Sequence, residues 1–117
     1  MLASVIGSQV ETMVSQIVDL LGDLETDEKT ALRYAKVLAD KSGIQAHSVG
    51  ETMITDDIRE SAKHWRKSAF EFCKNELIRG SALAHNVGRF DLVSRCEGLK
   101  NEVHLVMQGT MESATMA

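Results

Sequence analysis

The chain has 117 residues, a formal net charge of −4 and no proline. This length suits one domain that buries its own core, and the negative charge argues weakly against a dedicated nucleic-acid binder. Average usage would give roughly six prolines, at about 5% of residues, so their absence favours long uninterrupted helices. Alternating β-branched stretches are also missing, which excludes strand-rich folds and predicts an all-α protein.

The first predicted helix covers residues 3–24. Its apolar residues recur at alternating spacings of four and three from Ile6 to Leu24, so they share one helical face. A second apolar seam lies beside the first and widens this face beyond what one antiparallel neighbour covers. An ordinary core helix and a dimer or partner interface both fit this pattern, and a dimer would cover both seams. The predicted interface consists of Val10, Met13, Val14, Ile17, Val18 and Leu21.

A second helix is predicted from the N-cap Thr26 to Lys41 or Ser42. Two acids follow Thr26 in the first turn, where the helix dipole favours negative charge, and Gly43 stops the helix. Its apolar face is small and alanine-rich, so it should pack on one side only. Residues 43–54 show no long period, but the S-x-x-E pattern at 48–51 predicts a short helical turn or an early start of the next helix.

The central stretch, residues 55–80, carries the single Trp and two of the three Phe. Thr55 is a good N-cap, and apolar residues recur at spacings of four and three along one face, from Ile58 to Leu77. We predict that the helix ends at Gly80, with a break at Gly88 as the alternative. The bulky Trp65 lies between small residues that would let a partner helix approach closely. The predicted partner groove consists of Trp65, Ala69 and Phe72.

Residues 81–107 are predicted to form a further helix, with a split near Gly88 as the alternative. An apolar stripe runs from Leu83 to Val106. Gly88 and Gly98 would each cost about 1 kcal/mol in a helix interior, so they mark helix ends or close contacts. The last nine residues, 109–117, are small, polar and aperiodic. We therefore expect a single helical domain at 1–108 and a disordered tail at 109–117.

Basic residues form a row beside the apolar face of the central helix. Two such rows in a dimer would follow a duplex phosphate backbone by charge and shape without reading bases. Acids at Glu60, Glu71 and Glu76 lie close enough to neutralise part of the row by intrahelical pairing. The row consists of Arg59, Lys63, Arg66, Lys67 and Lys74.

No catalytic motif, phosphate-binding loop or zinc spacing occurs in the sequence. Asp56, Glu60 and His64 share a helical face but lack the paired Glu-x-x-His pattern of bundle metal sites. Cys73 and Cys96 are predicted to be buried, reduced thiols in a cytoplasmic protein, because two distant cysteines make no disulfide framework. We expect no catalytic residues, no metal and no cofactor.

The sequence therefore predicts a small antiparallel bundle of four to five helices that forms a homodimer. Its main hairpin would be 55–80 with 81–107. The leading functional hypothesis is a non-enzymatic regulatory or adaptor protein that binds another, unidentified protein through its helices. A sequence-nonspecific binder of duplex RNA or DNA is the first alternative, and a helical small-molecule sensor with a pocket near Trp65 is the second. No membrane span is expected, because polar residues interrupt the N-terminal apolar run.

Overall fold

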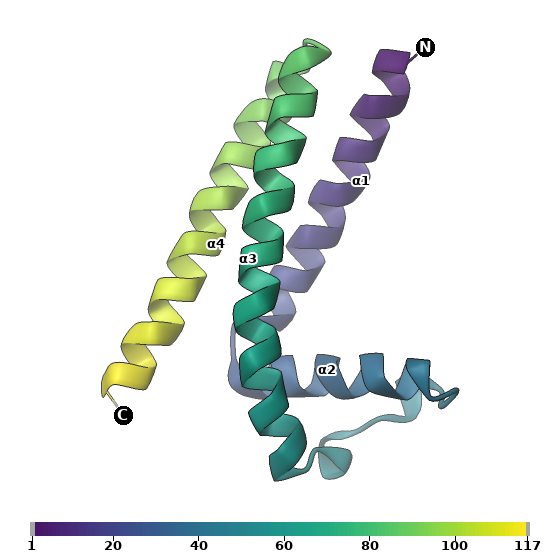
Figure 1. The fold of residues 1–117 in the computed structure, drawn as a ribbon, viewed down its shortest axis with the longest axis vertical. Helices are drawn as coiled ribbons and strands as arrows, with labels where there is room; N and C mark the ends of the chain where they lie inside the picture. The colour runs from purple at the N-terminus through teal and green to yellow at the C-terminus, as the bar shows by residue number, and fades with distance from the viewer. Residues whose placement is uncertain (1, 117) are drawn as a thin grey trace. The chain divides into compact units, whose positions relative to one another are not determined.

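The structure, a computed structural model, describes residues 2–116, with side chains described for residues 2–109. This part of the chain is helical and contains no strand, which confirms the all-α class. Four α-helices and two short 3₁₀ turns follow one another along the chain (Figure 1). Their bounds are α1 Leu2–Asp23, α2 Asp27–Lys41, η1 Ala46–Ser48, η2 Glu51–Met53, α3 Asp56–Asn86 and α4 Phe90–Met116.

The chain divides into two compact units, and α3 contributes to both of them. Unit 1 contains α1 up to Gly22, the part of α3 from Phe70 onward, and α4; unit 2 contains residues 23–69. None of the helices in the described part of the chain carries an apolar run long enough to cross a membrane. The single domain expected at 1–108 stays a prediction. The disorder expected at 109–117 stays one too, because the side chains of residues 110–117 lie outside the described part.

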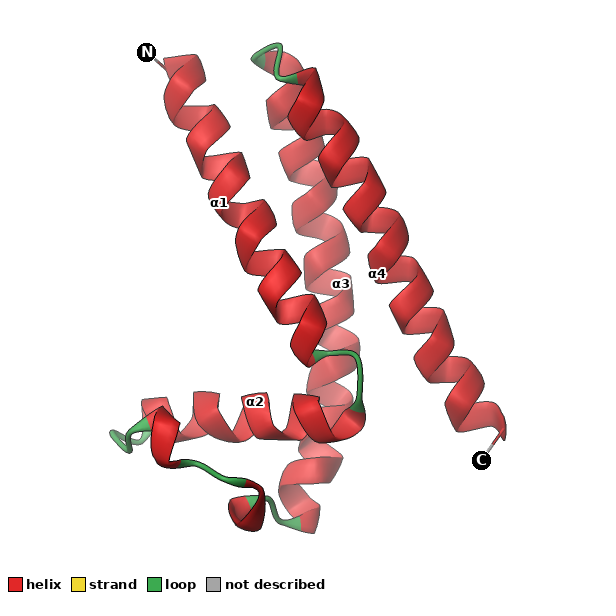
Figure 2. Ribbon diagram, turned by 180° about the vertical axis from the view of Figure 1, so that it is seen from behind, coloured by secondary structure: helices red, strands yellow, loops and turns green. Residues whose placement is uncertain are grey.

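In unit 1, three helices lie side by side, with α1 and α4 antiparallel to α3 (Figures 1 and 2). This antiparallel arrangement follows from the short connection of residues 87–89 between α3 and α4. The core consists of aliphatic side chains, one phenylalanine and both cysteines. Its buried residues are Val10, Val14, Ile17, Leu21, Phe70, Cys73, Leu77, Ala84, Leu92, Cys96, Leu99 and Val103.

The predicted helix end at Gly80 is wrong, and the alternative at Gly88 is correct. Helix α3 continues to Asn86, and Gly88 has a φ of +76°, a left-handed conformation that L side chains rarely adopt. Gly80 is instead buried inside α3, where a Cβ atom would collide with the Met13 side chain of α1. The glycine serves the close approach of two helices, so the hairpin of unit 1 pairs the part of α3 from Phe70 to Asn86 with α4.

The position of Phe72 on the buried stripe is also wrong. Phe72 is 56% exposed, whereas Phe70 is 3% exposed and belongs to the core. The reason is geometric, because successive residues turn by about 100° around a helix. Phe70 then lies about 60° from the fully buried Cys73, and Phe72 lies about 100° away from it.

In unit 2, α2 crosses the first part of α3 steeply, so the antiparallel arrangement predicted for all helices does not hold here (Figure 2). Its buried face is short and flat, made of Ala31, Ala35 and Ala39. Small side chains of this kind let a second helix approach closely without long ridges to align it. The segment carrying η1 and η2 returns along α2 and contributes Val49 and Ile54 to the same core.

The predicted N-caps are confirmed. Thr26 accepts a hydrogen bond from the backbone N–H of Lys29 at 3.1 Å, and Thr55 accepts one from that of Ile58 at 3.2 Å. The predicted end of α2 is also confirmed, because Gly43 follows it with a φ of +80°. The short turn expected at 48–51 exists, but Ser48 does not cap it: η2 begins after Gly50, and the Ser48 hydroxyl donates to the Gln45 carbonyl.

Candidate protein-binding surface

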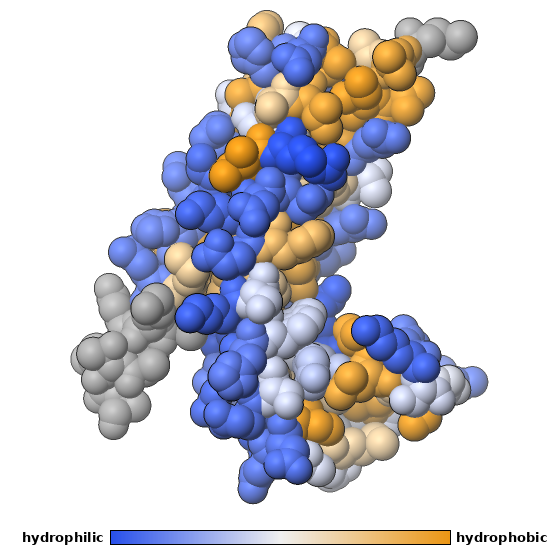
Figure 3. All heavy atoms as spheres, in the orientation of Figure 1, coloured by the Kyte–Doolittle hydropathy of each residue, from blue (hydrophilic) through white to orange (hydrophobic). Residues whose placement is uncertain are grey.

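The outward face of α1 is almost free of charge. Between Leu2 and Val18 the only ionisable side chain is Glu11. Leu2 and Val5 are exposed, and Figure 3 shows apolar residues gathered over the first turns of this helix. Apart from Val5 and Glu11, the exposed residues from Ser4 to Gln16 carry hydroxyl or amide groups. A solvated helix usually carries charges on its outer face, so this surface is unusual for one that contacts only water.

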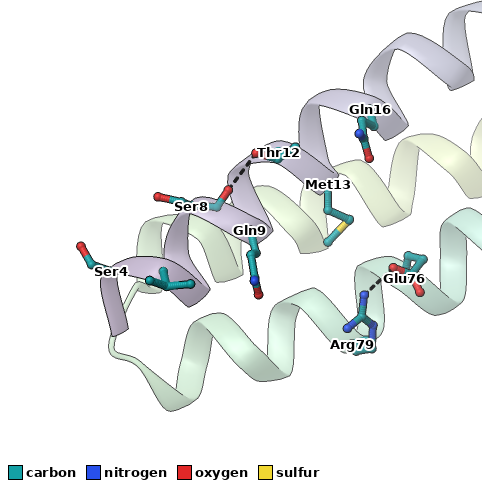
Figure 4. Close-up of a pocket in the computed structure, with 9 residues that line it drawn as sticks. Ser4, Ser8, Gln9, Thr12, Met13, Gln16, Glu76 and Arg79 are labelled. Atoms are coloured by element: carbon teal, nitrogen blue, oxygen red, sulfur yellow. Dashed lines mark hydrogen bonds and ion pairs between the residues drawn. The ribbon is translucent and has the colours of Figure 1, made fainter. Parts of the chain in front are cut away.

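An open groove of about 590 Å³ runs between α1 and α3 in unit 1. In Figure 4, Met13 and Gln9 point from α1 toward the α3 wall, where Glu76 and Arg79 are joined by an ion pair of 2.7 Å. The Thr12 hydroxyl donates to the Ser8 carbonyl at 3.0 Å, so it is held along α1. The groove is lined by Ser4, Val5, Ser8, Gln9, Thr12, Met13, Gln16, Glu76 and Arg79.

The groove depends on the close contact of Met13 with Gly80. Besides Met13, a Cβ atom on Gly80 would lie 3.6 Å from the Cys96 sulfur and 3.7 Å from a Val10 methyl group. The two helices therefore touch along their inner edges while their outer edges diverge. On the outer edge the hydrogen bond from Arg79 to Glu76 raises the pKa of the guanidinium, so the α3 wall carries one cation and one anion that neutralise each other.

The N-terminal end of α1 is fixed by Arg89, from the turn between α3 and α4. The Arg89 side chain lies over Gly7, whose Cβ would be 3.0 Å from its Nη1 atom. Its guanidinium donates to Glu11 at 2.8 Å and to both carboxylate oxygens of Asp91 at 3.0 Å. The hydrogen bond from Arg89 holds the pKa of Asp91 below its ordinary value. The one carboxylate in the first turns of α1 is thus paired within unit 1, on a different side of the helix from the groove.

Most of the interface residues predicted on α1 lie in the core of unit 1. Val10, Val14, Ile17 and Leu21 are buried, so they meet the chain's own α3 and α4 side and no partner reaches them in the folded unit. This corrects the predicted location of an interface. Most of the two apolar seams is therefore covered within one chain. Met13 is half-buried at the groove, and Val18 is 46% exposed.

The predicted partner groove does not hold together as a set. Trp65 is half-buried and packs on Tyr34, with ring centroids 6.0 Å apart and planes tilted by 52°. Ala69 is buried, whereas Phe72 is exposed. These side chains have three different environments, so they do not line one groove. A ligand pocket near Trp65 stays a prediction.

The basic row is interrupted at its centre. Arg66 is only 4% exposed, because its guanidinium donates to the Leu24 carbonyl at 2.8 Å and to the Asp27 carboxylate at 2.5 Å. A buried guanidinium bound to its own chain is poorly placed to reach a duplex, and its role as a phosphate contact stays a prediction. Of the others, Lys67 and Lys74 are exposed.

The intrahelical pairing predicted from Glu60 is found within the row, whereas Glu76 pairs with Arg79, which lies outside the row. Arg59 pairs with Asp56 at 3.3 Å, and also with Glu28 of α2, while Lys63 lies 3.9 Å from Glu60. These pairs neutralise part of the positive charge that the row would offer to a phosphate backbone.

Among the described residues, no three His, Cys, Asp or Glu side chains come together in a way that would hold a metal ion. Cys73 and Cys96 are buried, as predicted, and form no disulfide, and burial raises the pKa of Cys96, which keeps this thiol protonated at neutral pH. What the surface of unit 1 offers is shape and hydrogen-bonding groups.

Sequence reasoning missed the groove because it concentrated on apolar residues. The missed signal is the four-residue spacing of Ser4, Ser8, Thr12 and Gln16. Positions at this spacing share one edge of a helix. An edge made only of uncharged polar residues, beside exposed Val5, indicates a surface that avoids charge.

Comparison of the chain with family models, with curated proteins and with solved structures found no match. The candidate surface therefore rests on its geometry and chemistry.

Proposed function

We propose that this chain is a non-enzymatic regulatory or adaptor protein that works by helix-mediated binding of another polypeptide chain. The observation that supports this most is the uncharged outer face of α1 beside the groove toward α3. A helix laid in such a groove gains contact area from Val5 and Met13 without desolvating a charge on α1. Ser, Thr and Gln side chains on the same face both donate and accept, so they satisfy polar groups on an incoming helix.

The groove is better suited to a helix than to a small molecule. It is open along its length, and its walls are two helices that diverge toward solvent. Small-molecule sites bury most of the ligand's surface in a concave cavity, which an open groove does not do. Peptide-binding grooves are lined in this way, with apolar contacts at the bottom and polar groups at the rim.

A duplex-binding role has less support. Within the row, Arg66 is buried, and Arg59 and Lys63 form ion pairs with acids of the same chain. The exposed residues that are left to contact phosphates are Lys67 and Lys74. Affinity for a phosphate backbone grows with the number of phosphates neutralised, so two lysines supply little of this affinity.

A cytoplasmic location stays a prediction.

Site-directed photo-crosslinking tests the proposal. A photo-reactive amino acid replaces Gln9 in the groove, and in the matched control it replaces Gln108, an exposed glutamine on α4. The chain is irradiated in its source cell, and the crosslinked products are identified by mass spectrometry. We expect a discrete polypeptide adduct from position 9 that position 108 does not give. Adducts of equal yield from both positions, or none from either, would refute binding at this face.

A further inference from the structure

We propose that the occupant of the groove is a second copy of this chain, whose α1 lies antiparallel to the first α1 across a two-fold axis. This inference rests on the proposed function and names its partner. It also relocates the homodimer expected from the sequence, because most of the apolar seams of α1 are used inside the chain and the face of α1 that lines the groove is uncharged.

Charge is what favours the chain's own copy over another protein. A two-fold contact places the same surface against itself, so a charged surface meets like charge there. All six exposed α1 residues of the groove are neutral, and the two charged residues of the α3 wall form a pair with each other. The outer face of α3 in unit 1 differs, because it carries Glu71 and Lys74 as exposed charges.

The neutral α1 face lacks the complementary charges by which a surface usually selects a different protein as its partner. Complementary charge steers encounter and rejects wrong partners, and a face without charge offers neither. A surface that must meet itself gains from that neutrality. A protein with a net charge of −4 needs one face where its copies approach without local repulsion, and α1 provides it.

The hydrogen-bonding groups of the face are compatible with self-pairing. In an antiparallel pair of helices, positions equally far from the axis on opposite sides meet each other. An axis between residues 10 and 11 brings Gln9 of one copy level with Thr12 of the other, and Val5 level with Gln16. Amide and hydroxyl groups each donate and accept, so Gln9 and Thr12 can satisfy each other, whereas Val5 offers Gln16 an apolar contact with its methylene groups. The small side chains of Ser4 and Ser8 let the helix axes approach.

A charge-introduction series tests the occupant. In the full chain, Gln9→Glu and Gln16→Glu together place four carboxylates in the contact while preserving side-chain shape. The control, Gln45→Glu with Gln108→Glu, makes the same change in net charge at exposed positions outside the groove. Sedimentation equilibrium should give a dimer for the wild type and the control. We expect the dissociation constant of the groove variant to rise about 100-fold or more, because like charges become juxtaposed in the interface.

A mixing experiment separates self-association from a change in folding. A Gln9→Lys and Gln16→Lys variant should also be monomeric alone, whereas a mixture with the glutamate variant should form a heterodimer that native mass spectrometry resolves. Circular dichroism checks that both variants keep the wild-type helix content. A mixture that stays monomeric, a wild type that is monomeric at every concentration, or a groove variant that dimerises as the control does would each overturn the inference.

The two proposals fail differently. If position 9 crosslinks to a different protein and the wild type is a monomer, the proposed function stands and the second copy is wrong. If position 9 crosslinks to nothing and the wild type is a monomer, both are wrong.

Discussion

Arg66 of α3 donates a hydrogen bond of 2.5 Å to the carboxylate of Asp27, in the first turn of α2. Its Nε atom donates at 2.8 Å to the carbonyl of Leu24, a residue with no exposed surface. The Arg66 side chain thus supplies hydrogen-bond donors both to the backbone just before α2 and to the first turn of that helix. From its spacing in the sequence Arg66 looked like a surface base, but in the structure it links two segments within unit 2.

Replacing Arg66 with alanine should destabilise the protein. The substitution leaves the buried Leu24 carbonyl without its donor and removes a charge-assisted bond to Asp27. Such losses cost about 2–3 kcal/mol, so the free energy of unfolding in urea should fall by that amount. Lys67→Ala is the matched control, since Lys67 is exposed, and it should stay within about 0.5 kcal/mol of wild type. Equal effects of the two substitutions would contradict the buried position of Arg66.

Replacing Gly80 and Gly98 with a larger residue should change the stability of the protein in opposite directions. Gly80→Leu forces atoms into Met13, Val10 and Cys96, so we expect a net loss of about 1–3 kcal/mol in unfolding free energy. Gly98 is exposed on α4 with nothing within 4 Å of an added Cβ. Gly98→Leu should therefore stabilise the protein by up to about 1 kcal/mol through helix propensity. Chemical denaturation followed by circular dichroism measures both, and a stabilising Gly80→Leu would show that α1 does not pack closely there.

Alanine substitutions at the two phenylalanines of α3 in unit 1 should lower the unfolding free energy by very different amounts. Phe70→Ala removes a buried ring and should cost about 3–5 kcal/mol in unfolding free energy. Phe72→Ala truncates a ring that is more than half exposed, so its cost should stay below about 1 kcal/mol. The comparison is made by urea unfolding of both variants under one condition. A larger loss at Phe72 would restore the register predicted from the sequence.

The Arg89–Asp91 contact should make stability depend on pH in the acid range. Because Arg89 lowers the pKa of Asp91 in the folded state, the contact stabilises the protein above the unfolded pKa of about 3.9. That contribution is lost as the pH falls through the lower folded pKa. The difference in urea midpoint between wild type and Asp91→Asn should therefore be present at neutral pH and shrink in strong acid. A difference that grows toward low pH would contradict the assigned direction.

Local rules made much of the fold predictable. Thr26 and Thr55 were readable as N-caps because hydroxyl capping acts over three residues, and the end of α2 at Gly43 follows from conformational freedom at one position. The helical class and the buried cysteines follow from composition and spacing. These features depend on interactions within a few residues of the chain, which a sequence displays directly.

The tertiary structure decided the rest. Gly80 has the chemistry of a helix end, but Met13, 67 positions earlier in the chain, makes it a packing residue instead. Arg66 has the spacing of a surface base, and only its contact with Leu24 and Asp27 buries it. The apolar pattern of α1 predicts that two seams avoid water, and the fold decides that most of both seams lies inside the chain, with Val18 left exposed. A helix's own sequence states which faces avoid water, whereas what covers each face depends on residues distant in the chain.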